Sequence, residues 1–239
     1  MSDYSLDPVV ENTLQNITTA TITTILFKHG LRNIWLRGPR PLSQNQPRTV
    51  GRAFTMRFIP AREDLSNPTA WSSPRSTRVA IETMPAGCIV VADAMGVIDA
   101  GVVGDILCAR MVKRGVKALI TDGVVRDATG VRGTELPVWS QGSAAPAAVT
   151  SLHFANWEEP IACGGVSVFP RDIIVADDDG AIVIPETYLE PVLEQGREQE
   201  ELEAWIYTQV ERGASLPGMY PPNEETLQLY EQERRNAGD

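Results

Sequence analysis

The chain has 239 residues, of which 43% are apolar, so it can bury a core without disulfide bridges. No apolar run approaches the roughly 18 residues needed to cross a bilayer, and the first residues lack the basic and apolar regions of a secretory signal. The three cysteines (Cys88, Cys108 and Cys163) are odd in number and far apart, which argues against a disulfide framework or a CxxC metal site. We therefore expect a cytoplasmic protein that has no membrane partner.

The net charge of −10 is distributed unevenly along the chain. Residues 1–170 carry 16 basic and 14 acidic side chains, whereas residues 171–239 carry 5 basic and 17 acidic side chains. Because an acidic chain repels phosphate backbones, we do not expect nucleic acid as a partner. The acidity of the C-terminal part is typical of a solvated, charged helix.

Residue counts also restrict the kind of metal site. Two histidines, His29 and His153, cannot by themselves build a His-rich zinc site, and only three lysines are available for Schiff-base chemistry. A metal ion would instead be held by carboxylates and water, the oxygen ligands that suit magnesium or manganese. His153 lies close to two aromatic residues in the sequence and is interpreted as structural rather than as a metal ligand.

In chain order, residues 9–30 show the apolar spacing of a helix that ends at Gly30. Residues 31–50 are predicted to be irregular, and residues 50–59 alternate as a half-buried strand does. Residues 60–76 carry three prolines and several serines and are predicted to form a long loop. Loops of this length are uncommon and often functional.

The middle of the chain predicts a βαβ unit. Residues 88–92 form a continuous apolar run, typical of a strand buried on both faces. Residues 105–114 are predicted to form a helix with an apolar stripe, with Asp105 as N-cap and Gly115 as its end. Residues 116–121 are the next strand, which completes the unit.

The last third of the chain predicts further strands and then helices. The strands are expected at residues 165–169, 173–176 and 181–184, with turns between them. One of these turns, residues 177–180, is rich in aspartate but lacks the downstream glutamate of a calcium loop, so a turn is the favoured interpretation. An acidic helix is expected at residues 186–212 and a short helix at residues 223–235. We predict one domain over residues 1–212 and, over residues 213–239, an extension that packs on a neighbour or stays mobile.

The βαβ topology brings two distant segments together. The helix begins at the carboxyl edge of the first strand, and the second strand ends at the same edge. The segment from Gly104 to Leu107 and the pair Arg126-Asp127 should therefore share one rim, although 20 residues separate Asp105 from Arg126. Open α/β sheets bind ligands at such a rim.

The residue types at this rim suit a small carboxylate substrate. The start of the helix offers unpaired backbone N–H groups near Ile106 and Leu107, and Arg126 can bind a carboxylate or an enolate oxygen. Asp127 can hold a divalent cation, and Asp105 can orient or deprotonate a water molecule. Two simpler alternatives stay open at this stage: Asp105 is only an N-cap, and Arg126-Asp127 is an ordinary polar turn.

A family resemblance rests on these same residues. The pattern Gly101-x-x-x-Asp105, followed after 20 residues by Arg126-Asp127-x-x-Gly130, resembles the signature of the RraA-like proteins and the 4-hydroxy-4-methyl-2-oxoglutarate aldolases. The resemblance implies a swivelling-type α/β/β/α sandwich with N-terminal helices and a C-terminal helical extension. It also implies assembly as a homotrimer or homohexamer, with active sites between subunits.

The resemblance further implies a metal-dependent class II aldolase. Such enzymes cleave 4-hydroxy-4-methyl-2-oxoglutarate or 4-carboxy-4-hydroxy-2-oxoadipate to pyruvate and a second oxo acid. Many also decarboxylate oxaloacetate, because both reactions pass through the pyruvate enolate. The alternative is a non-catalytic regulator, since short relatives inhibit an RNA-degrading endonuclease by binding to it.

The family pattern also implies roles for particular residues of this chain. Asp127 would coordinate magnesium or manganese, and Asp105 would position a water molecule that moves protons. A carboxylate from the C-terminal helix of a neighbouring subunit would lie near the metal, with Glu198 and Glu201 both open as candidates. The residues implied to bind substrate are Gly104, Asp105, Ile106, Leu107 and Arg126.

Overall fold

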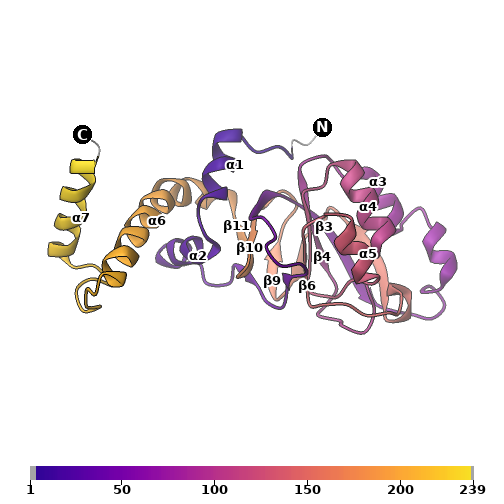
Figure 1. Cartoon of the computed structure of the whole chain (residues 1–239). Coiled ribbons are helices and arrows are strands. Elements are labelled where there is room, and N and C mark those ends of the chain that lie inside the picture. The colour runs from indigo at the N-terminus through magenta and orange to yellow at the C-terminus, as the bar shows by residue number, and fades with distance from the viewer. Residues whose placement is uncertain (1–3, 238–239) are drawn as a thin grey trace.

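The computed structural model of the chain describes residues 4–237 and places strands between two layers of helices (Figure 1). The strands are β1 (Trp35–Leu36), β2 (Arg40–Pro41), β3 (Thr49–Pro60), β4 (Cys88–Asp93), β5 (Ala118–Thr121), β6 (Val138–Ser140), β7 (Leu152–Trp157), β8 (Ile161–Cys163), β9 (Val166–Val168), β10 (Ile173–Asp177) and β11 (Gly180–Ile184). The α-helices are α1 (Pro8–Gln15), α2 (Thr19–Lys28), α3 (Thr77–Thr83), α4 (Asp105–Arg114), α5 (Ala128–Gly133), α6 (Leu189–Glu211) and α7 (Glu224–Ala237). Short 3₁₀ helices are η1 (Pro68–Ser72), η2 (Ala148–Thr150) and η3 (Glu186–Tyr188).

The main sheet is organised around its long strand β3. Its strand order is β1-β11-β10-β3-β4-β5-β6-β2. Strand β4 pairs in parallel with one edge of β3, while β10 and β7 pair antiparallel with successive parts of the other edge. Helices α3, α4 and α5 connect the parallel strands β3, β4, β5 and β6. The predicted βαβ unit is thereby confirmed as β4-α4-β5.

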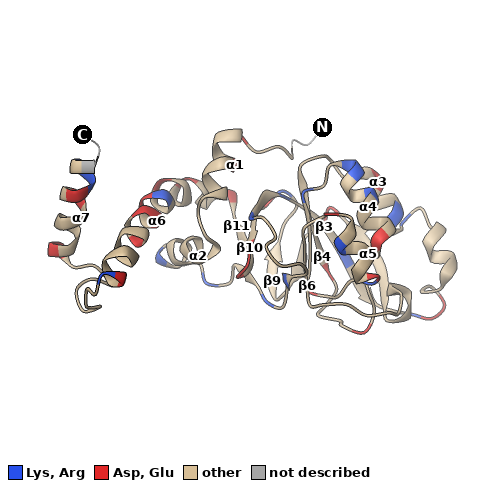
Figure 2. Cartoon of the chain, in the orientation of Figure 1, with Lys and Arg blue, Asp and Glu red and all other residues tan. Residues whose placement is uncertain are grey.

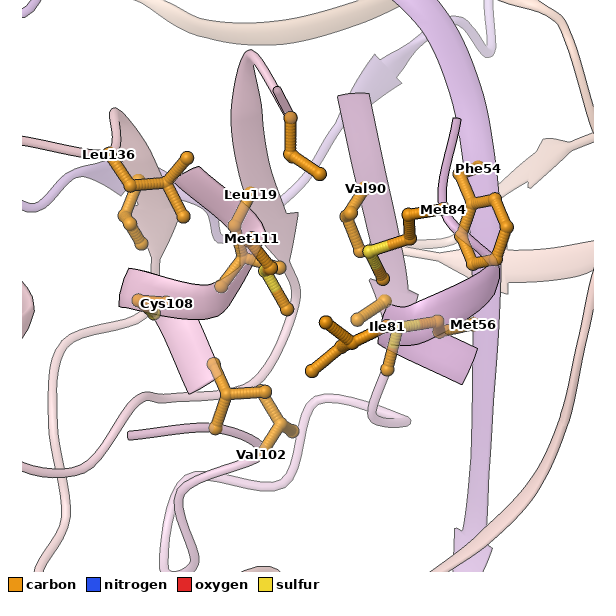
Figure 3. Packing of buried hydrophobic residues seen from close by; sticks show 14 of the residues in the cluster. Phe54, Met56, Ile81, Met84, Val90, Val102, Cys108, Met111, Leu119 and Leu136 are labelled. Atoms are coloured by element: carbon orange, nitrogen blue, oxygen red, sulfur yellow. The ribbon is translucent and has the colours of Figure 1, made fainter. Parts of the chain in front are cut away.

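An outer apolar layer fills the space between helices α3 to α5 and the parallel strands. Ile81 of α3 and Met111 of α4 face Val90 and Leu119 of the sheet, and all four side chains are at most 1% exposed (Figure 3). Full burial of one such side chain contributes roughly 1.5–3 kcal/mol. Cys108 packs in the same layer, where burial raises the pKa of its thiol to about 12 and keeps it neutral.

A second apolar layer lies inside the curled sheet, between β4 to β6 and the β10–β11 hairpin. Trp139 of β6 crosses this layer, and its Nε1 donates a hydrogen bond of 2.7 Å to the carbonyl oxygen of Asp177 on β10. The two halves of the sheet are therefore linked through the core, and Trp139 is a core residue. Together with the helices on both outer faces, this layer gives the expected α/β/β/α sandwich.

The N-terminal helical region corrects one prediction. A single helix was expected over residues 9–30, but the chain forms α1 and α2 with a break between them. A residue next to the break and a residue far along the sequence both stabilise it. The Thr18 side chain caps α2 by accepting from the N–H of Thr21, and the Asp177 carboxylate accepts from the backbone and hydroxyl of Thr19 at 2.9 and 2.7 Å. The capping signal at Thr18 was present in the sequence and was outweighed by the continuous apolar spacing.

The C-terminal helices form an arm that extends away from the sheet (Figure 1). Helix α7, which lies within the predicted extension, folds back on the distal part of α6. The rings of Trp205 and Tyr230 lie 5.4 Å apart, and the indole N–H of Trp205 donates to Glu233 at 2.8 Å. Figure 2 shows acidic residues along α6 and α7, as the charge distribution predicts.

Several short elements were not predicted from the sequence, namely α3, α5, β6, β7 and β8. The short strands β1 and β2 were not predicted either, and they lie within the segment that was expected to be irregular. Most of these elements span fewer than two helical turns or only a few strand residues, so the sequence carries little periodicity for them. The three cysteines are free and buried, so the expectation of no disulfide framework is confirmed. Within residues 4–237, no helix has both the length and the apolar character needed to span a bilayer.

Candidate functional site

Three chain segments run side by side beyond the carboxyl ends of β4 and β5. Gly101 forms parallel bridges with Val124 and with Ala147. The N–H of Arg126 donates to the carbonyl oxygen of Val103 at 2.9 Å. The start of α4 and the Arg126-Asp127 pair therefore meet at one rim, as the βαβ topology predicts.

The glycines of the sequence pattern are explained by how closely these segments approach. A Cβ atom on Gly101 would lie 2.5 Å from the backbone nitrogen of Arg126, and one on Gly104 would lie 2.7 Å from Oδ2 of Asp127. A Cβ atom on Gly130 of α5 would lie 2.4 Å from Oδ2 of Asp105. These distances are too short for any side chain, so the glycines allow both aspartates to reach the rim.

Asp105 is not the N-cap of α4. Gly104 occupies that position, and Asp105 is the first helical residue, with its Oδ1 accepting from the N–H of Ile106 at 2.7 Å. Of the two backbone amides predicted to bind substrate, the Ile106 amide is therefore already engaged. The N–H of Leu107 has no hydrogen-bond partner among residues 4–237. The positive end of the α4 dipole adds to the attraction for an anion at this point.

Arg126 and Asp127 form a partly exposed ion pair at the rim. Arg126 Nε lies 3.2 Å from Asp127 Oδ2, and the two side chains are 38% and 48% exposed. Within the described part of the chain, the terminal amino groups of Arg126 have no hydrogen-bond partner, and its buried Nε has none either. Asp127 has a φ of +53°, a left-handed conformation that aspartate tolerates better than most residues. The guanidinium group is therefore available to bind a carboxylate in bidentate fashion.

A second aspartate of the same loop, Asp122, was not predicted as important. It is only 4% exposed, and its carboxylate accepts from the N–H groups of Ala94, Gly96 and Gly164 at 2.7, 3.2 and 3.1 Å. Burial raises the pKa of Asp122, and the three N–H groups act against that rise. This carboxylate fixes the loop that leads from β4 to Gly101. The sequence signals for it are an aspartate directly after a buried strand and the segment Thr121-Asp122-Gly123, which is part of the family resemblance.

The rim offers a limited set of ligands for a divalent cation. No cluster of three or more His, Cys, Asp or Glu side chains suited to a metal is found in residues 4–237. Magnesium needs only one or two protein carboxylates because it keeps several water ligands. Asp127 offers one such carboxylate, partly exposed and next to Gly104, so the residues fit a hydrated magnesium or manganese ion.

The two glutamates implied for a neighbouring site lie on α6. Glu198 is exposed, and Glu201 pairs with Arg197 at 2.9 Å and with Arg234 at 3.3 Å. Helix α6 lies on the opposite side of the sheets from α4 (Figure 1). Neither glutamate can therefore reach the rim of its own chain.

Comparison with known proteins places this chain in a family. A family model described as RraA-like, Aldolase/RraA, matches residues 19–183, a span that contains the rim residues from Gly101 to Gly130. The chain belongs to the RraA-like family. Its fold agrees, since the crystal structure of RraAS2 from Streptomyces coelicolor, described as an unusual member of the RNase ES inhibitor RraA protein family, superposes with a TM-score of 0.75. That match has 29% sequence identity and covers 85% of this chain and 98% of RraAS2.

Two curated proteins share sequence with this RraA-like chain. It is 30% identical over 203 residues to protein DlpA of Legionella pneumophila, which covers 85% of this chain and 32% of DlpA. It is 32% identical over 114 residues to "Putative 4-hydroxy-4-methyl-2-oxoglutarate aldolase" of Halalkalibacterium halodurans, which covers 48% of this chain and 54% of that protein. The matched regions thus span about a third and about half of these two relatives. The names of the relatives include both an aldolase and an inhibitor family.

Proposed function

We propose that this chain is a divalent-metal-dependent lyase that cleaves a 4-hydroxy-2-oxo diacid to pyruvate and a second oxo acid. The substrate would be of the 4-hydroxy-4-methyl-2-oxoglutarate or 4-carboxy-4-hydroxy-2-oxoadipate type, and oxaloacetate would be decarboxylated at the same site. The observation that carries the proposal is the meeting of the α4 start with Arg126 and Asp127 at one rim. The aldolase named among the relatives supports it.

The chain's own residues can bind and orient such a substrate. The free amino groups of Arg126 would grip the carboxylate of the 2-oxo acid, and the Leu107 amide with the α4 dipole would hold an oxygen beside it. When bound, a divalent cation at Asp127 would supply Lewis-acid polarisation of the 2-oxo group. Cleavage of the C3–C4 bond, or loss of CO₂ from oxaloacetate, sends the electron pair to the C2 oxygen and forms an enolate. Arg126 would stabilise that developing negative charge.

Asp105 is positioned to assist the proton transfers through a water molecule. Its Oδ1 is held by the Ile106 N–H, and its Oδ2 lies against Gly130, so the carboxylate is fixed while lone pairs remain for a water molecule. In the aldol cleavage, that water would accept the proton of the C4 hydroxyl group. It would then deliver a proton to C3 of the enolate, which completes pyruvate. In the decarboxylation, only the second proton transfer is needed.

The test is pyruvate release from oxaloacetate with and without EDTA, corrected for the metal-catalysed background without protein. We expect metal-dependent turnover that falls about 10²- to 10³-fold in Arg126→Ala, because a positioned charge at the reacting oxygen is lost. Arg132→Ala on α5 is the matched control and should leave turnover unchanged, since within residues 4–237 the Arg132 side chain donates to the Leu42 carbonyl alone. Turnover that survives both EDTA and Arg126→Ala would refute the proposal.

The second candidate is a non-catalytic regulator that binds and inhibits a ribonuclease. The likeness to RraAS2, which belongs to an RNase ES inhibitor family, favours it. The same assay separates the two functions. Absence of turnover with any divalent metal, together with tight binding to a ribonuclease, would support the regulator.

We also propose a homotrimer or homohexamer as the working form. Three apolar side chains are exposed on the loop before the rim and at the start of α4: Met95 at 43%, Ile98 at 60% and Ile106 at 80%. Exposed apolar side chains grouped near a site are typical of a protein interface. Light scattering after size-exclusion chromatography should give three or six times the chain mass of 26.1 kDa. A monomer would contradict this assembly and leave Glu198 and Glu201 without a site.

A further inference from the structure

The long loop predicted at residues 60–76 covers a cavity that the candidate active site does not use. The cavity has a volume of about 460 Å³ and lies between this loop, the end of β3, the start of α3 and strand β7. None of the rim residues, from Gly101 to Leu107 or at Arg126 and Asp127, lines it. The loop is anchored beside β7 by a hydrogen bond from Ala61 N–H to the carbonyl of Ser151 at 2.9 Å. The volume is within the range of small-molecule sites.

The walls of the cavity are aromatic. Phe58 of β3 and Phe154 of β7 meet edge to face with ring centroids 5.3 Å apart. Trp71 of η1 lines the cavity from the loop side and is 39% exposed, and Leu65 beside it is 45% exposed. Apolar side chains left this exposed on a loop gain stability when a flat apolar ligand covers them.

The polar groups of the cavity favour an anion. Arg75 lines it, and its guanidinium group has no hydrogen bond or ion pair with any residue the structure describes. Asp64 is the acidic side chain of the lining, and it is already paired with Arg62 at 2.7 Å. Because Arg62 neutralises the Asp64 carboxylate, the unpaired Arg75 leaves the cavity lining with a net positive charge.

His153 supplies a second donor. Its Nδ1 lies 3.2 Å from Oγ of Ser66, and that oxygen accepts from the N–H of Arg62 at 3.0 Å. In the tautomer in which the Ser66 hydroxyl donates to Nδ1, the ring N–H is on Nε2. Within residues 4–237 that Nε2 has no partner, and the ring lines the cavity.

We propose that this cavity binds a small aromatic carboxylate. Its ring would lie among Phe58, Trp71 and Phe154, and its carboxylate would pair with Arg75 and accept from the Nε2–H of His153. Such a site is separate from the proposed active site, so its test does not depend on catalytic activity.

The experiment is titration calorimetry of the full chain with benzoate, benzamide and acetate. Benzoate has both the ring and the charge, benzamide has the ring alone, and acetate has the charge alone. We expect benzoate to bind at least about tenfold more tightly than either of the others, because a charge-assisted contact and an aromatic contact each add to affinity.

Two variants and a control locate the binding. Arg75→Met should reduce the benzoate affinity to that of benzamide and leave benzamide unchanged, whereas Trp71→Ala should weaken both. Arg110→Met removes one positive charge from an exposed arginine that pairs with Glu82 outside the cavity, and it should change nothing. The proposal is overturned if benzoate shows no saturation up to about 10 mM. It is equally overturned if Arg75→Met and Arg110→Met behave alike.

Discussion

Asp122 and Asp127 lie in the same loop after β5, yet their carboxylates have opposite surroundings. Asp122 is buried, and three backbone N–H groups occupy its oxygens. Asp127 is half exposed, and among the residues that the structure describes the one polar contact of its carboxylate is the Arg126 Nε at 3.2 Å. Three backbone donors leave the buried Asp122 carboxylate at most one of its about four lone-pair sites, so it holds the loops in place, whereas the exposed Asp127 carboxylate can take a ligand. Residue type alone does not distinguish the two, but the number of occupied lone pairs does.

The largest effect on stability should come from removing the Asp122 carboxylate. Asp122→Ala leaves three buried N–H groups without an acceptor and should lower the free energy of unfolding by about 3 kcal/mol or more, measured by urea denaturation. Asp99→Ala is the control, since Asp99 is exposed on the neighbouring loop, and it should change stability by less than about 0.5 kcal/mol. If both variants unfold at the same urea concentration, Asp122 is not a structural anchor.

A smaller effect, on the rate of pyruvate release, is expected from a substitution at Gly130, which leaves room for the Asp105 carboxylate. In Gly130→Ala the new Cβ would lie 2.4 Å from Asp105 Oδ2, so the carboxylate must move away from its position at the rim. Pyruvate release should fall about tenfold, because misplaced catalytic groups lose rate steeply. Gly133→Ala lies on the same helix with nothing within 4 Å, so it should retain activity and gain up to about 1 kcal/mol of stability. Equal activity of the two variants would remove Asp105 from the mechanism.

These positions also show what could be predicted from the sequence. The rim itself could be predicted, because a buried strand, a helix with an apolar stripe and a second strand leave one arrangement for a parallel βαβ unit. The family pattern then selected Asp105, Arg126 and Asp127. The role of Asp122 could not be predicted, because its partners at Ala94, Gly96 and Gly164 come from two other loops whose positions depend on the folded sheet.

The same limit applies to the helices. The split between α1 and α2 depends on Asp177, which is distant in sequence and accepts from Thr19 only when the β10–β11 hairpin packs beneath it. The cavity under the loop likewise needs β3 and β7 to pair, and β7 was not predicted. Local sequence patterns therefore predicted the strands and helices whose boundaries depend on nearby residues. The boundaries and cavities that depend on long-range contacts could not be predicted in this way.

The smallest expected effect repeats the comparison on helix α6, where the Glu200 carboxylate is hydrogen-bonded and Glu198 is exposed. Glu200 Oε1 accepts from the backbone N–H and from the hydroxyl of Thr18, both at 2.7 Å. Partial burial acts to raise the pKa of Glu200, but these hydrogen bonds and one from Thr21 outweigh it and lower the pKa. Since the folded pKa lies below the unfolded value of about 4.3, Glu200 stabilises the protein above that pH. This contribution is lost as the pH falls through the folded pKa.

Glu200→Gln should therefore lower the free energy of unfolding by about 1 kcal/mol at neutral pH, with the deficit shrinking as the pH falls below about 4. Glu198→Gln, on the exposed face of the same helix, should match the parent chain at every pH. Denaturant unfolding of the three proteins across this pH range measures both. A deficit for Glu200→Gln that stays constant with pH would mean that the shape of the side chain, rather than its charge, ties α6 to the start of α2.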